Sequence, residues 1–266
     1  DKRTIAMTTI FVGVGLGILF GATMVPLLLG NSIAAAWYGV ATAGSVAALV
    51  ARWGWSRLGY IERPAPAVGP EGPRRGGFTW MAIVAASFLF SFGIVPHTIY
   101  WFDYISRDLG HGYWFAGLHW TGVGVFAILG PLFAAWLAGI AGTAFATGLI
   151  YLAMTIGIGL PWITHSAAAL AVSTMIFGAQ PAVSTLLGAR ARDLGAPTDM
   201  PAMMRTIILS NGIGSAIGGM SVPMLLSVTG SYEALFLAGG IAFAVATLLL
   251  APAALASRSP PVSRLN

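Results

Sequence analysis

Long stretches without a charged side chain alternate with short polar segments along this chain. Thr4–Gly30, Asn31–Ala51 and Gly76–Phe102 contain no Asp, Glu, Lys or Arg. Each run is long enough for an α-helix that crosses a bilayer, which takes about 20 apolar residues. The pattern therefore predicts three membrane spans in the first part of the chain.

The uncharged block from Leu109 to Ala189 is much longer than one span. At about 20 residues per helix it holds three helices, and we expect turns at Gly139–Gly142 and at Pro161–Ser166. Thr206–Tyr232 and Ala234–Ser257 supply two more uncharged runs. The pattern as a whole predicts an all-α membrane protein with about eight transmembrane helices.

Composition supports this class. Of 266 residues, 57% are apolar and 8% are charged, whereas a soluble domain carries about 25% charged residues. The lipid bilayer is therefore the expected surrounding. The chain has no cysteine, which excludes thiolate metal sites and disulfides. Its basic residues stand singly along the membrane flanks, so we expect no nucleic-acid partner.

The basic residues also predict an orientation. With the N-terminus inside, twelve of the 13 Lys and Arg residues fall on the cytoplasmic side and only Arg107 falls outside. Such a bias is typical of membrane proteins, whose cytoplasmic loops are enriched in Lys and Arg. We expect a multi-pass protein of a bacterial inner membrane with both termini in the cytoplasm. Residues 52–77, rich in Pro and Gly, are a predicted cytoplasmic linker, and residues 258–266 a cytoplasmic tail.

Two short motifs recur at one spacing. Phe92–Pro96 is echoed by Phe177–Pro181, and Arg107–Gly110 by Arg192–Gly195, both at an offset of 85 residues. Three predicted spans separate the copies, so the copies cross the membrane in opposite directions. Residues 78–257 are therefore a predicted inverted repeat of three plus three helices, an arrangement found in many secondary transporters.

Several segments resemble those of major facilitator superfamily (MFS) transporters. These are Phe88–Pro96 with the following Arg107 and Asp108, and Gly13–Gly17 ahead of a short segment that contains Trp37. The resemblance rests on these motifs together with the predicted topology. It extends over nearly the whole chain.

The resemblance implies a domain organisation. Residues 1–51 would be the last two helices of the N-terminal half, 52–77 the linker between halves, and 78–257 the six-helix C-terminal half. Family members usually carry twelve spans, four more than are predicted here. The missing part of the N-terminal half is therefore an expected partner. The charged loop motif of the family has no counterpart in Leu137–Thr143, and the cytoplasmic contact that this motif forms is not expected here.

Polar side chains inside a membrane are candidates for function. His97 and His119 lie at similar predicted depths, and Tyr100 and Trp101 follow His97 by three and four residues, on the same helix face. We expect these four to line one half of a central cavity, where a histidine could bind a proton or a substrate anion. The alternative is an interfacial histidine with packing aromatic rings.

Two amides and two prolines complete the candidate set. Gln180 and Asn211 are predicted near the middle of their spans, where each either faces the cavity or makes an interhelical hydrogen bond. Pro96 and Pro181 lie at equivalent positions of the repeat. Each is expected to kink its helix, because proline removes a backbone hydrogen bond.

The expected function is secondary transport of a small solute by alternating access, with proton coupling left open. The alternative is a truncated or non-transporting membrane scaffold that keeps the half-fold. No enzyme, cofactor or metal is expected. The histidines at 97, 111, 119 and 165 have no spacing typical of metal ligands, and the predicted spans contain no carboxylate for acid–base chemistry.

Overall fold

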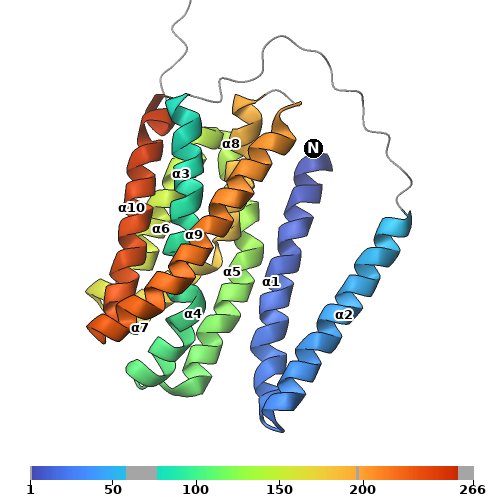
Figure 1. Ribbon diagram of the computed structural model, residues 1–266, viewed down its shortest axis with the longest axis vertical. Helices are drawn as coiled ribbons and strands as arrows, with labels where there is room; N and C mark the ends of the chain where they lie inside the picture. The colour runs from blue at the N-terminus through green and yellow to red at the C-terminus, as the bar shows by residue number, and fades with distance from the viewer. Residues whose placement is uncertain (1, 58–76, 196–197, 257–266) are drawn as a thin grey trace, which may run out of the picture.

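The computed structural model describes residues 2–57, 77–195 and 198–256. Figure 1 shows a bundle of helices with α1 and α2 along one edge. The helices are α1 (Lys2–Leu29), α2 (Ile33–Arg57), α3 (Phe78–Gly93), α4 (Val95–Asp103), the π-helix η1 (Tyr104–Asp108), α5 (Gly112–Ala141), α6 (Thr143–Ile163), α7 (Ala167–Gly178), α8 (Pro181–Leu194), α9 (Met200–Thr229) and α10 (Tyr232–Ala256).

The described helices supply seven or eight membrane spans, in agreement with the prediction of about eight. Seven helical stretches are long and apolar enough to cross a membrane, and the Gly13–Leu29 part of α1 is a shorter apolar helix. The turns after α5 and α6 fall inside the two predicted turn regions. Helix α2 continues to Arg57, into the predicted linker. Residues 58–76 of that linker and the predicted tail 258–266 lie outside the described residues.

Two spans consist of two helical segments in series. Helix α3 ends at Gly93 and α4 begins at Val95, while α7 ends at Gly178 and α8 begins at Pro181. In Figure 1 α3 lies above α4, whereas α7 lies below α8, so the two broken spans run in opposite directions. This arrangement confirms the inverted repeat. We refer to the end where Phe78 begins α3 as the Phe78 end, and to the end with the α6–α7 turn as the His165 end.

Packing follows the same pseudo-symmetry. The two repeats exchange α3 with α7, α5 with α9 and α6 with α10. The α3–α9 contact then corresponds to the α5–α7 contact, and the α3–α10 contact to the α6–α7 contact; all four contacts occur. Helices α6 and α10 pack on each other along the centre, where the Thr155 and Thr247 hydroxyls lie 3.1 Å apart. The 91-residue offset between Pro161 and Pro252 maps Thr155 to within one residue of Thr247. The pseudo-two-fold axis therefore passes close to this pair.

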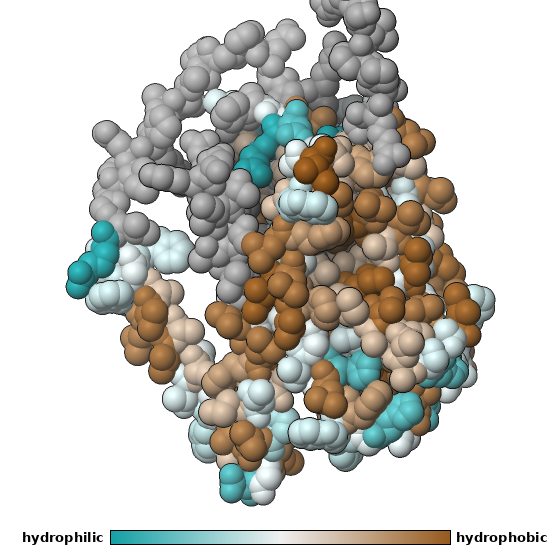
Figure 2. Space-filling view, turned by 180° about the vertical axis from the view of Figure 1, so that it is seen from behind, coloured by the Kyte–Doolittle hydropathy of each residue, from teal (hydrophilic) through white to brown (hydrophobic). Residues whose placement is uncertain are grey.

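The surface of the bundle is suited to lipid. Figure 2 shows hydrophobic residues over the middle of one face and hydrophilic ones gathered toward the ends. Large apolar side chains such as Met220 and Leu248 are 79% and 73% exposed. Side chains of this size exposed over a wide belt are typical of a membrane protein, since a soluble monomer rarely shows large contiguous apolar patches.

Glycines let the repeat-related helices approach closely. A Cβ on Gly214 of α9 would overlap the backbone oxygen of Phe88 in α3. A Cβ on Gly122 of α5 would likewise lie 3.1 Å from the methyl group of Thr174 in α7. Close helix approach at small residues supplies much of the packing energy between membrane helices.

Gly214→Ala is expected to destabilise the protein by about 1–3 kcal/mol, because backbone cannot yield as a flexible side chain can. Gly212→Ala on the same helix is the matched control, since no atom lies within 4 Å of its Cβ position. Thermal unfolding in detergent measures both variants. Equal melting temperatures for the two would contradict the close α3–α9 packing.

Candidate functional site

The candidate site lies in the half of the bundle nearer the His165 end, where α4, α5 and α7 meet. His97 of α4 has a fully buried side chain, and its Nε2 lies 2.9 Å from the Oγ of Ser173 in α7. Its ring stacks on Trp101 with the centroids 4.6 Å apart. Phe177 and Phe236 lie against the same imidazole at 5.0 and 4.7 Å. A histidine is thus enclosed by aromatic rings with one polar contact.

The second nitrogen of His97 has no such contact. Nδ1 is buried and has no hydrogen-bond partner among the described residues. Whichever tautomer is present, a buried polar atom is left unsatisfied, at a cost of about 1–3 kcal/mol. An unsatisfied buried group calls for an explanation, and one explanation is that it binds a proton or ligand during function.

His119 of α5 makes a parallel contact one residue further along α7. Its Nδ1 lies 2.6 Å from the Oγ1 of Thr174, and the indole N–H of Trp101 donates to the same oxygen at 3.2 Å. An indole nitrogen can only donate, so Thr174 accepts from Trp101 and its own hydroxyl proton can be donated to His119. Trp101 thus stacks on one histidine and is hydrogen-bonded, through Thr174, to the other.

Ser173 and Thr174 are the functional candidates that sequence reasoning missed. They are adjacent hydroxyl residues inside an apolar helix, and each binds a different histidine. Such residues carry little signal, because a serine or threonine in a helix often bonds to its own backbone. Thr121 and Thr155 do so in this protein. The sequence did hold one further signal: the predicted membrane depth of Ser173 and Thr174 is similar to that of His97 and His119.

Asn211 lies in the other half of the bundle, toward the Phe78 end. Its Oδ1 accepts from the hydroxyl of Ser87 in α3, a fully buried side chain. The 92-residue offset between Pro131 and Pro223 maps His119 onto Asn211. The α5–α7 and α9–α3 contacts therefore join corresponding helices at opposite depths of the bundle, with Ser87 two residues from the counterpart of Thr174.

The other predicted residues lie apart from the histidines. Tyr100 packs on Tyr232 with the ring centroids 5.8 Å apart. Gln180 is partly buried in the break between α7 and α8. Pro96 and Pro181 lie in the first turns of α4 and α8, directly after the two breaks. The structure thus brings together His97, Trp101 and His119, and separates these from Tyr100, Gln180 and Asn211.

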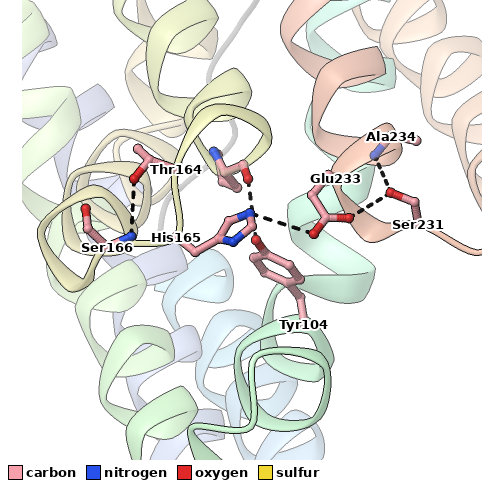
Figure 3. A network of polar contacts seen from close by, with 8 residues as sticks. Tyr104, Thr164, His165, Ser166, Ser231, Glu233 and Ala234 are labelled. Atoms are coloured by element: carbon pink, nitrogen blue, oxygen red, sulfur yellow. Dashed lines mark hydrogen bonds and ion pairs between the residues drawn. The ribbon is translucent and has the colours of Figure 1, made fainter.

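A second polar cluster closes the His165 end (Figure 3). His165, in the α6–α7 turn, lies 3.7 Å from a carboxylate oxygen of Glu233 at the start of α10. The hydroxyl of Ser231 donates to the same carboxylate at 2.7 Å, and the Tyr104 hydroxyl donates to the backbone oxygen of Pro161 at 3.4 Å. These contacts link η1 to the last turn of α6, and the α6–α7 turn to the start of α10, at one end of the bundle.

Thr174→Val removes the hydroxyl that two buried side chains share, so it is expected to destabilise the protein by about 1–3 kcal/mol. The matched control is Thr121→Val, because within the described ranges this hydroxyl bonds to the Gly117 carbonyl of its own helix, at 3.0 Å, and to no other helix. Unfolding in detergent measures both. If the two variants were equally stable, the Thr174 contacts would carry no energy.

The family model described as "Uncharacterised MFS-type transporter YbfB" matches residues 1–251. A comparison of the chain with curated proteins finds none that matches. The matched region includes both the α1–α2 pair and the six-helix inverted repeat, so these parts belong to one family architecture.

Proposed function

This chain belongs to a family of major facilitator superfamily transporters, and on that premise we propose that it moves a small solute across the membrane by alternating access. The observation that carries the proposal is a pair of polar contacts between corresponding helices, His119–Thr174 in one half of the bundle and Asn211–Ser87 in the other. Inverted repeats can exchange conformations between their two copies, which is how alternating access arises in secondary transporters. Family membership does not favour the alternative of a non-transporting scaffold.

Each polar contact holds a long helix against a broken one. When α5 and α7 separate, the His165 half opens and the Asn211 contact stays formed; when α9 and α3 separate, the reverse holds. The two states have similar free energies because each state breaks one of the two polar contacts and keeps the other. A transporter requires two states whose free energies are within a few kcal/mol.

The buried histidines supply a means of proton coupling in this proposal. His97 and His119 are the two described titratable side chains that lie at the α7 hydroxyls. A proton taken up by either imidazole would replace an acceptor by a donor and change its bond to Ser173 or Thr174. Opening of the His165 half and proton binding would then be linked.

Tyr100, Trp101 and Gln180 remain proposed members of the solute pathway.

Weakening one contact should shift the chain toward one state. The cysteine-free sequence permits single reporters at Thr98 of α4 and Ser184 of α8, which lie within one residue of equivalence in the repeat. Ser87→Ala removes the hydroxyl that reaches both Asn211 and the backbone oxygen of Ile207 in α9, so it is expected to increase water-soluble maleimide labelling of S184C and decrease that of T98C. Loss of one hydrogen bond, about 1 kcal/mol, shifts the population roughly fivefold.

His119→Ala is expected to shift labelling in the opposite direction, and Ser215→Ala, on an exposed part of α9, serves as the control. Labelling that rises at both reporters in every variant would indicate local loosening rather than exchange between two states. Flux of candidate solutes into reconstituted vesicles, measured for the same variants at several pH values, identifies the solute and the coupling.

We further propose that a helix from an N-terminal half covers α9. On α5, the equivalent face is covered by α1: Gly15 of α1 packs against Gly124 and Ile128. The offset of 92 residues maps these two onto Ala216 and Met220 of α9. Both are exposed in the described part of the chain. Pseudo-symmetry thus supports an equivalent helix partner on α9, one with a small residue at the crossing.

A nitroxide at Met220→Cys tests this in the protein in its native membrane. Under the proposal, oxygen dissolved in the lipid reaches this label much less than a label at Leu248→Cys, on the α10 surface. A covering helix excludes lipid, and hence oxygen, from the first position only. Equal oxygen accessibility at the two positions rules out a helix on α9.

The proposed location is a bacterial inner membrane with the Phe78 end in the cytoplasm. Arg190, Arg192 and Arg205 lie in helix ends at the Phe78 end, and Arg107 lies at the His165 end. This distribution follows the enrichment of basic residues in cytoplasmic loops. Both termini would then be cytoplasmic.

A further inference from the structure

A pocket at the Phe78 end lies on the side of the bundle formed by α3, α6, α8 and α10. Nine residues of these four helices line it, mainly small or apolar ones with the hydroxyls of Thr79 and Thr147. The one charged residue among them is Arg190 of α8. The pocket is separate from the histidine site, which lies toward the other end of the bundle.

Arg190 makes this pocket positive. Its side chain is 12% exposed, and one guanidinium nitrogen lies 3.7 Å from the carboxylate of Asp193. That carboxylate is 44% exposed and also accepts from the hydroxyl of Thr143. A guanidinium has five N–H donors in a planar fork that suits phosphate oxygens. Because these donors point in different directions, one guanidinium can contact the Asp193 carboxylate and a phosphate oxygen at the same time.

Two helices begin at the pocket and add to its positive potential. Phe78 and Thr79 form the start of α3, and Ala144 and Thr147 belong to the first turns of α6. Neither helix has a side-chain hydrogen bond at its N-cap residue. The first N–H groups of a helix carry partial positive charge and favour anions. Here they reinforce the charge of Arg190.

The rim of the pocket is apolar. Phe78 is 62% exposed at the edge, and Leu249 and Ala253 of α10 complete the lining on that side. Leu248 and Leu255 on the neighbouring turns of α10 are exposed to 73% and 68%. A ligand here meets positive charge at the membrane end and apolar surface along the span. An anion with acyl chains has this distribution of polarity.

We propose that an anionic phospholipid binds over this small pocket, with its phosphate at Arg190 and an acyl chain along the surface formed by Phe78 and Leu249. Basic pockets between transmembrane helices on the cytoplasmic side are suited to anionic headgroups. The inference rests on the proposed placement of the Phe78 end in the cytoplasmic leaflet, and it is independent of any solute. Because the lipid would bridge α3, α6, α8 and α10, it would stabilise both repeats together.

Native mass spectrometry of the purified full chain tests the proposal, with phosphatidylglycerol, phosphatidylcholine and inorganic phosphate as probes. Phosphatidylglycerol is expected to remain bound at lower concentrations than phosphatidylcholine. Arg190→Gln should weaken phosphatidylglycerol binding roughly tenfold, the usual effect of losing a charged hydrogen-bond donor. Arg192→Gln, an exposed arginine on the same helix, is the matched control and should leave binding unchanged.

A second variant tests the shape of the pocket without changing charge. Ala144→Leu fills the space beside the start of α6 and should also reduce phosphatidylglycerol binding, in a chain whose Arg190 is intact. Equal losses in the Arg190 and Arg192 variants would show diffuse attraction and overturn the proposal. So would unchanged lipid binding in Ala144→Leu, or displacement of the lipid by millimolar inorganic phosphate, which would identify a free anion as the ligand.

Discussion

A backbone N–H or C=O without a partner costs several kcal/mol in the apolar part of a bilayer, and the breaks in two spans are where this constraint is most demanding. The protein meets it locally. The N–H of Ile94 donates to Phe90 at 3.1 Å across the first break. At the second break the N–H of Gln180 donates at 3.0 Å to Phe177, the carbonyl that Pro181 would otherwise leave without a partner. The spans can therefore bend without exposing backbone to lipid.

The bends depend on close packing against neighbouring helices. Ala179 lies against Gly130 of α5, and Val95 against Gly218 of α9, where no larger side chain would fit. Each break is thus supported by a long helix from the opposite repeat. The same long helices carry His119 and Asn211, so backbone support and polar contacts occur together on α5 and α9.

The two ends of the bundle differ in their chemistry. At the His165 end, carboxylates pair with Arg107 and with His165, and Tyr232 donates to Asp103. At the Phe78 end, arginines outnumber carboxylates in the described helices, and helix starts add positive potential around Arg190. The pseudo-symmetry of the backbone is therefore not a symmetry of charge. An asymmetric membrane, with different lipids and potentials on its two sides, is matched by such a difference.

The sequence by itself determined the class, the approximate number of spans, the turns after α5 and α6, and the inverted repeat. These follow from charge spacing and span length, because lipid excludes charged side chains over a fixed thickness. Only the tertiary structure showed that His97 and His119 meet at Ser173 and Thr174, and that Tyr100 turns toward Tyr232. Helical periodicity gives a face to each residue but does not say which neighbouring helix lies there. That choice depends on contacts such as Gly214 against Phe88, which join residues far apart in the chain and leave no local pattern in it.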